Sequence, residues 1–276
     1  MIVGAHESIA GGVSQAFARA EEHGAKSFQI FTKNARGWKA PPLTEGERQA
    51  FRAEARRTRL PSIAHGSYLV NLGTEDPALR EKSIACVREE LTRCEQLGIA
   101  YLVIHPGGHP DEALGLRLIA HGLDEVHQAT PRFKTKIALE VTAGQGNCLG
   151  WRFEHLAEIL SQVSREARLA LCLDTCHLHA AGYDLTTPRR YEGVMADLDR
   201  LVGLARVRCF HLNDCKKPLG CRVDRHEEIG QGTLGLAPFR ALVNDPRFTD
   251  AVGVLETPFP ERYPEAIRLL NSLRRG

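Results

Sequence analysis

The side chains best suited to chemistry in this sequence are histidines, aspartates and glutamates, and they recur at the ends of short apolar runs. Imidazole nitrogen and carboxylate oxygen are ligands that Zn²⁺, Mn²⁺ and Fe²⁺ take in proteins. Taken singly, each residue has an ordinary structural explanation, such as a buried hydrogen bond. A shared metal site is more economical than six coincidences. The six strand-end residues are His65, His105, Glu140, Asp174, His211 and Glu256.

Two more groups of donors lie just beyond these runs. His177 follows Asp174 by three residues, so the first turn after the strand brings it within reach. Asp224 and His226 are two residues apart and face one side of an extended loop that begins at His211. Such a pair is usually part of a solvated loop, but its position here favours the same site. Nine donors are too many for one ion and suit three, if one carboxylate bridges.

Three divalent ions would give this site a positive charge. They bring +6 against −4 from four carboxylates, which leaves a local +2 and attracts a phosphodiester. The whole chain also carries a formal net charge of only +2, so any attraction for phosphate must be local. The four carboxylates are Glu140, Asp174, Asp224 and Glu256.

The elements that must hold these donors are short apolar strands alternating with amphipathic stretches. Each run is rich in Ile, Val, Leu or Phe, as is typical of a strand buried on both faces. Eight alternations favour a closed parallel (β/α)₈ barrel, also called a TIM barrel, in one domain over residues 1–276. A doubly wound open sheet is the alternative, but no G-x-G-x-x-G follows the first strand. The predicted strands lie near 2–7, 27–32, 62–67, 101–107, 136–142, 169–176, 207–214 and 251–259.

Helix signals and side-chain alternation agree with a barrel. Thr44 and Glu47 form a capping box ahead of a helix predicted over 45–59. A second, long helix is predicted to begin at Asp76-Pro77 and to end at Gly98. Within the sixth strand the small residues share one face with Asp174, so we expect the strand-end donors to point into the barrel mouth.

Composition sets the remaining expectations. The chain has 276 residues, 43% hydrophobic and 25% charged, which is ordinary for a protein with a sizeable core. No apolar run approaches the ~20 residues of a membrane span. The first residues lack the layout of a secretion signal, so we expect a cytoplasmic protein. The eight cysteines form no C-x-x-C pair, and Cys172 and Cys209 lie in apolar runs, where reduced cysteine acts as a small hydrophobe.

These motifs together resemble the endonuclease IV family of apurinic/apyrimidinic (AP) endonucleases. The resemblance extends over essentially the whole chain, and the motifs are specific in combination, whereas one alone would be only suggestive. It is strongest in residues 65–72 (HGSYLVNL), 173–177 (LDTCH), 211–216 (HLNDCK) and 223–226 (VDRH), with support from 142–146 and 255–257.

The resemblance implies a site for three zinc ions, with Mn²⁺ or Fe²⁺ as partial substitutes. His65, His105 and Glu140 match the ligands of one ion. Glu140, as a bridge, matches the second with Asp174, His211 and Glu256, and the third is matched by His177, Asp224 and His226. All nine positions hold the expected residue type. Val141, where asparagine is expected, and Cys215 and Cys221, where serine is usual, depart from the family pattern.

The implied reaction is hydrolysis of the DNA phosphodiester 5′ to an abasic site, leaving a 3′-hydroxyl and a 5′-deoxyribose phosphate, together with removal of blocked 3′ ends. Glu140 or Glu256 is expected to accept the proton of the attacking water. The implied substrate is double-stranded DNA, cut by a monomer at the nucleoid. Arg36, Tyr68 and Leu69 match positions that penetrate the DNA, although composition alone would make such rim residues a cover for the barrel top.

Two other functions compete with this interpretation. A sugar isomerase or epimerase on a related barrel would use Glu140, Asp174, His211 and Glu256, but it would not need the other five donors. A DNA-binding or scaffold protein without catalysis is disfavoured because a full set of donors has little use without chemistry.

Overall fold

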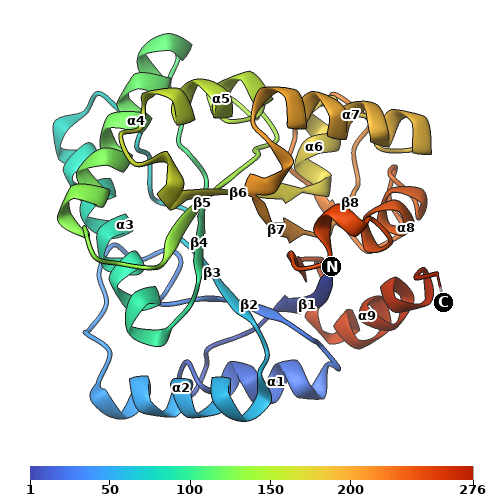
Figure 1. Cartoon of the computed structure of the whole chain (residues 1–276), viewed down its shortest axis with the longest axis horizontal. Helices are drawn as coiled ribbons and strands as arrows, with labels where there is room; N and C mark the ends of the chain where they lie inside the picture. Colours follow the sequence, from blue (N-terminus) through green and yellow to red (C-terminus); the bar gives the residue numbers. More distant parts are fainter. Residues whose placement is uncertain (276) are drawn as a thin grey trace.

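The computed structural model describes residues 1–275, whose parallel strands close into a barrel with helices around the outside (Figure 1). Their order around the barrel is β1-β10-β7-β6-β5-β4-β3-β2, and closure comes from β1, which pairs with both β2 and β10. The predicted (β/α)₈ barrel is therefore confirmed. The barrel strands are β1 (Ile2–His6), β2 (Phe28–Phe31), β3 (Ser62–His65), β4 (Tyr101–Ile104), β5 (Lys136–Glu140), β6 (Leu169–Asp174), β7 (Val207–His211) and β10 (Val252–Leu255).

The helices follow the predicted signals closely. Thr44 caps its helix with the expected box, in which its hydroxyl accepts from Glu47 N and its own N–H donates to the Glu47 carboxylate. That helix ends one residue earlier than predicted, because Arg59 turns to φ 56° and closes it. The α-helices are α1 (Gln15–Glu22), α2 (Glu45–Thr58), α3 (Pro77–Leu97), α4 (Glu112–Ala129), α5 (Phe153–Gln162), α6 (Thr175–Ala181), α7 (Pro188–Leu201), α8 (Ala237–Val243) and α9 (Tyr263–Ser272).

The inside of the barrel is filled by a small apolar cluster, separate from the larger core between strands and helices. Its members alternate with outward residues, and they include Ala138, Cys172 and Val254. Each of these lies two residues before a predicted donor, so the side chains of Glu140, Asp174 and Glu256 continue the inward-facing rows to one mouth of the barrel. The cluster consists of Ile63, Val103, Ala138, Ala170, Cys172, Cys209, Val252 and Val254.

All eight barrel strands end one to four residues before their predicted ends, and three of these differences concern the donors most directly. β4 stops at Ile104 and β10 at Leu255, so His105 and Glu256 are the first residues after their strands. β7 stops at His211 instead of running to 214, and two residues later Asn213 is held by the Thr175 side chain. Thr175 Oγ1 donates to the Asn213 carbonyl at 2.6 Å and accepts from Asn213 N at 2.9 Å.

A short antiparallel pair beyond the barrel was not predicted from the sequence. β8 (Asp214–Cys215) pairs with β9 (His226–Glu227), and Cys215 lies opposite His226. This pairing returns the loop after β7 to the barrel mouth.

The cysteines lie as the composition indicated. All eight cysteines are free thiols, and Cys172 and Cys209 are buried. Within residues 1–275, none of the helices has the length and apolar character that crossing a membrane requires.

Candidate metal centre

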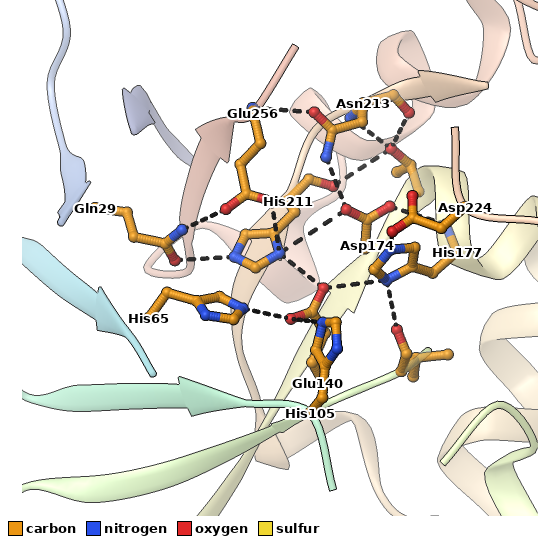
Figure 2. A network of polar contacts seen from close by, with 12 residues as sticks. Gln29, His65, His105, Glu140, Asp174, His177, His211, Asn213, Asp224 and Glu256 are labelled. Carbon is orange, nitrogen blue, oxygen red and sulfur yellow. Dashed lines mark hydrogen bonds and ion pairs between the residues drawn. The ribbon is translucent and has the colours of Figure 1, made fainter. Parts of the chain in front are cut away.

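Glu140, the last residue of β5, lies at the centre of the predicted donors (Figure 2). Its Oε2 atom is 3.1 Å from His65 Nε2 and 3.2 Å from His105 Nε2. Its Oε1 atom is 2.9 Å from His211 Nδ1 and 3.1 Å from His177 Nδ1. One oxygen therefore faces His65 and His105 and the other faces His211, which is the arrangement a bridging ligand needs.

A second group of donors forms around Asp224 on the loop before β9. Its Oδ2 atom is 3.2 Å from His177 Nε2, and its Oδ1 atom is 3.2 Å from His226 Nε2. His177 is placed by the start of α6, where Asp174 caps the helix by accepting the His177 N–H at 2.8 Å. The predicted position on the first turn after β6 is thus confirmed.

Asp174 joins this second group to the first. Its Oδ2 atom is 3.6 Å from His226 Nε2 and 3.8 Å from His211 Nδ1. Glu256 lies on the other side of His211, with Oε2 3.4 Å from Nδ1. All nine predicted ligands therefore lie in one cluster, although their roles as ligands stay predictions.

Donor atoms in this cluster are close enough to share ions. Neighbouring sets, whose donor atoms lie within 4.8 Å of one another, overlap at Glu140 and at Asp174. One further set includes the thiol of Cys176, which the sequence did not suggest as a donor. The sets are His65, His105 and Glu140; Glu140, Asp174 and His211; Asp174, His177 and His226; and Cys176, Asp224 and His226.

The electrostatics of the cluster fit a cation. Burial works against ionisation of Glu140, but His211 and His105 outweigh it and hold its pKa well below the usual value. Burial also opposes protonation of His211 and His226, yet Glu140 raises the pKa of the former, and Asp174 that of the latter, to about 9. Without an ion, protons on the imidazoles balance the carboxylates, and a metal ion would take the place of those protons.

A buried ring nitrogen without a hydrogen-bond partner also indicates a cation site. His226 Nε2 is shielded from solvent and makes no hydrogen bond of acceptable geometry to any described residue. Its other ring nitrogen donates to a backbone carbonyl, that of Glu256, at 3.1 Å. Because Nδ1 is held by that carbonyl, Nε2 is the ring nitrogen left to bind a cation once its proton is displaced.

Backbone carbonyls orient two other imidazoles in the same way. His65 Nδ1 donates to the carbonyl of the next residue at 2.8 Å, and His177 Nδ1 donates to the Val141 carbonyl at 3.0 Å. Both rings thereby direct Nε2 to the cluster. Because Val141 contributes its backbone to this contact, the departure from the family's asparagine leaves the hydrogen bond intact.

Two amide side chains that the sequence did not suggest fix the orientation of predicted ligands. Gln29 accepts from His211 Nε2 at 2.9 Å and donates to Glu256 Oε1 (Figure 2). Asn213 donates to Asp174 Oδ2 at 2.7 Å and accepts from Glu256 N at 3.0 Å. The available signal for Gln29 was a polar residue inside an apolar strand, and for Asn213 its place two residues after His211.

The three predicted DNA-contacting residues lie outside the donor cluster, on the loops after β2 and β3. Tyr68 is 58% exposed, and its ring centroid is 5.6 Å from that of His65, so it stands at the edge of the mouth. Arg36 is exposed and Leu69 half-buried. Tyr68 also lines a cavity of about 600 Å³, together with His65 and His105 among others. Their position is compatible with contact to a large substrate.

Comparison with known proteins points to one family. Residues 17–273 match a family model described as a xylose isomerase-like TIM barrel. The chain is 51% identical over 279 residues to a probable endonuclease 4 of Chloroflexus aurantiacus, covering 99% of this chain and 98% of that protein.

Comparison with solved structures points to the same family. The chain is similar to endonuclease IV from Thermus thermophilus, with a TM-score of 0.89 and 39% identity over 99% of this chain and 98% of that one. It is also similar to a D-tagatose 3-epimerase-like protein, with a TM-score of 0.77 and 18% identity over 99% and 97% of the two chains. That second likeness concerns the fold alone.

Proposed function

This chain belongs to the endonuclease IV family, and on that premise we propose that it is a DNA repair endonuclease that cuts at abasic sites. The bond hydrolysed is the phosphodiester 5′ to the lesion, which leaves a 3′-hydroxyl and a 5′-deoxyribose phosphate, and blocked 3′ ends are removed by the same chemistry. The observation that carries the proposal is the position of Glu140, whose Oε2 atom faces His65 and His105 and whose Oε1 atom faces His211, all within 3.2 Å.

Three zinc ions are the proposed cofactors, with Mn²⁺ or Fe²⁺ as partial substitutes. When bound, such ions neutralise charge on the phosphate and lower the pKa of a bound water to ~7. The donor chemistry fits, since nitrogen and oxygen ligands dominate the cluster. The proposed ligand sets are His65, His105 and Glu140; Glu140, Asp174, His211 and Glu256; and His177, Asp224 and His226.

The two candidate catalytic carboxylates differ in their surroundings. The Glu140 side chain is 1% exposed and both its oxygens are occupied by imidazoles. Its role is therefore to neutralise positive charge in the cluster and to fix the positions of the donors. The Glu256 side chain is 17% exposed; its Oε1 atom accepts from Gln29, whereas its Oε2 atom lies 3.4 Å from His211 Nδ1 and accepts no hydrogen bond from the described residues. We therefore assign acceptance of the water proton to Glu256 Oε2.

Access to this cluster requires a distorted substrate. The donors are mostly buried at the barrel mouth, so a phosphate inside a duplex reaches them only if the abasic nucleotide swings out of the helix. That movement costs a few kcal/mol and is cheapest where no base stacks. Arg36, Tyr68 and Leu69 are proposed to occupy the gap, as inserted side chains do in other DNA-bending proteins. One chain supplies all nine donors, so a monomer suffices.

A sugar epimerase is the second candidate, because proteins with that activity share the fold. It would use Glu140, Asp174, His211 and Glu256. It would leave without purpose the group around Asp224, in which His177 and His226 each approach a carboxylate oxygen to 3.2 Å. This argues for the nuclease.

The decisive experiment uses a duplex with a single abasic site. Purified protein is incubated with it, with and without a chelator, and the new ends are identified against an undamaged duplex of the same sequence. We expect a 3′-hydroxyl next to the lesion, only with the abasic duplex and only without chelator. Epimerisation of ketoses without cleavage would overturn the proposal, and chelator-insensitive binding without cleavage would favour the scaffold.

A further inference from the structure

A buried lysine lies beneath the loop that carries Arg36. The Lys33 side chain is 1% exposed, and its Nζ atom donates to the carbonyls of Gly37 at 3.1 Å and Trp38 at 2.8 Å. These two contacts hold the backbone on the far side of Arg36. The ammonium thus fixes the curvature of the loop over residues 34–39.

A buried glutamate on α3 holds the neighbouring loop in a similar way. The Glu90 side chain is 1% exposed, and both of its oxygens accept from Ser67 N, at 3.1 and 3.2 Å. Ser67 directly precedes Tyr68 and Leu69. Glu90 Oε1 is also 3.8 Å from Lys33 Nζ, so one ion pair underlies both loops.

The two loops are also joined to each other. Ser67 Oγ donates to the Ala35 carbonyl at 2.7 Å, and Tyr68 N donates to the same carbonyl at 3.2 Å. Ala35 is the residue before Arg36. The loop after β2 and the loop after β3 therefore form one connected unit, with Lys33 and Glu90 as its foundation.

A buried Lys33–Glu90 pair is an inefficient way to stabilise the fold. Burying a carboxylate and an ammonium removes both from water, and such a pair is often no more stabilising than apolar residues of the same volume. Burial raises the pKa of Glu90 to about 7, although Lys33 and the Ser67 amide oppose that change. What the pair provides is a fixed conformation for the loops above it.

We propose that Lys33 and Glu90 are positioning residues that hold Arg36, Tyr68 and Leu69 ready to insert at an abasic site. The inference rests on the proposed function. A preformed wedge avoids the cost of ordering loops during binding, so it strengthens binding without touching the reacting atoms.

The test uses full-length, zinc-loaded protein and compares Lys33→Met, Glu90→Gln and the double variant with the parent. We expect KM for an abasic duplex to rise about 10-fold, with kcat and metal content within about 2-fold of the parent. Amide exchange of residues 34–39 and 66–69 should accelerate in the absence of DNA. The loss of binding free energy in the double variant should be smaller than the sum of the losses in the two single variants, because both substitutions disrupt the same connected unit.

Glu89→Gln is the matched control. Glu89 is the preceding residue on α3 and lies 3.6 Å from Lys33 Nζ, but its side chain is 30% exposed. It leaves the Ser67 contacts with Glu90 intact, so KM and loop exchange should stay within about 2-fold of the parent. Ser67→Ala removes the hydroxyl bond to the Ala35 carbonyl and the bond that Leu69 N donates to the hydroxyl. It is a milder variant that should raise KM in the same direction even if Glu90→Gln folds poorly.

Each result decides the matter. Parent-like KM and loop exchange in Lys33→Met and Glu90→Gln would overturn the positioning role, as would a fall in kcat at unchanged KM. A parent protein that neither binds nor cuts the abasic duplex would overturn the proposed function and this inference together. A parent that cuts while its variants match it would overturn this inference alone.

Discussion

His211 Nδ1 lies 2.9 Å from Glu140 Oε1, at the fully buried end of the donor cluster. The second oxygen of this carboxylate points instead to the imidazoles contributed by β3 and the loop after β4. A carboxylate can bind a cation through each oxygen, whereas an amide offers one oxygen and one NH₂ group that binds no cation. Substitution of Glu140 by the isosteric amide is therefore the most direct test of a bridged centre.

Glu140→Gln should lower kcat for abasic-site incision at least about 100-fold and change DNA affinity far less. The reason is that binding depends on the rim, while hydrolysis depends on the bridge. Single-turnover incision and a binding titration separate the two effects. Glu256→Gln should behave similarly, with the metal at the His177 set largely retained. Near-normal turnover in Glu140→Gln would mean that the catalytic centre lies elsewhere.

Metal content is predicted at close to three transition-metal ions per chain, mostly zinc, in protein purified without a chelator. The reason is the complete set of nine donors in one cluster. Elemental analysis gives the number, and His226→Ala, which removes one ligand of the third set, should lower it to about two. Saturation of well-folded parent protein at a single ion would contradict the trinuclear centre and strengthen the epimerase alternative.

Gln29→Ala should weaken zinc binding about 10- to 100-fold without unfolding the protein. The Gln29 amide fixes the proton of His211 on Nε2, which leaves Nδ1 free for a cation, and it also orients Glu256. Competition with a chromogenic chelator measures the affinity. Gln49→Ala, at an exposed position on α2, is the matched control. Equal affinities for the two variants would show that the amide has no orienting role.

Simultaneous replacement of Arg36, Tyr68 and Leu69 by alanine should weaken abasic-duplex binding about 30-fold, which is the effect of one interface hot spot. Incision at low substrate should fall in parallel, while metal content and circular dichroism stay unchanged. The three side chains lie on the rim and contribute no ligand to the cluster. Arg208→Ala, an exposed arginine at the start of β7 and the opposite end of the barrel, should have no effect. Parent-like incision by the triple variant would end the wedge assignment.

His127 should make the folded protein sensitive to acid. It is 1% exposed on α4, neither ring nitrogen has a hydrogen-bond partner in the described part of the chain, and burial, reinforced by Arg168, lowers its pKa to about 4. The unfolded chain binds a proton at His127 below about pH 6.5, whereas the folded chain does so only near pH 4. The contribution of His127 to the free energy of unfolding is therefore fully present above pH 6.5 and falls by about 3 kcal/mol as the pH drops towards 4.

His127→Leu should remove that part of the pH dependence. Urea unfolding at pH 7.5 and pH 4.5 gives the difference, and His121→Leu, at an exposed histidine on the same helix, should keep the slope of the parent. If His127→Leu loses as much stability in acid as the parent, the buried imidazole does not carry the effect.

The donors and the barrel could be predicted from the sequence for a common reason. Parallel strands in a closed barrel all end at one rim, so the last residue of each short apolar run has a known destination. Alternation along a strand then states which side chains point inward, as it did for Asp174 and Glu140. Neither inference needs a distance between residues far apart in the chain.

Tertiary structure decided the contacts that depend on such distances. Nothing in the pattern around residue 29 says that its amide meets His211 and Glu256. Nothing in the long helix predicted to begin at Asp76-Pro77 says that Glu90 meets the Ser67 amide. The pairing of β8 with β9, and the place of Asp174 between two donor sets, are of the same kind. Periodicity reports how a residue faces relative to its neighbours in the chain, whereas these contacts arise only when separate loops and helices pack at fixed distances.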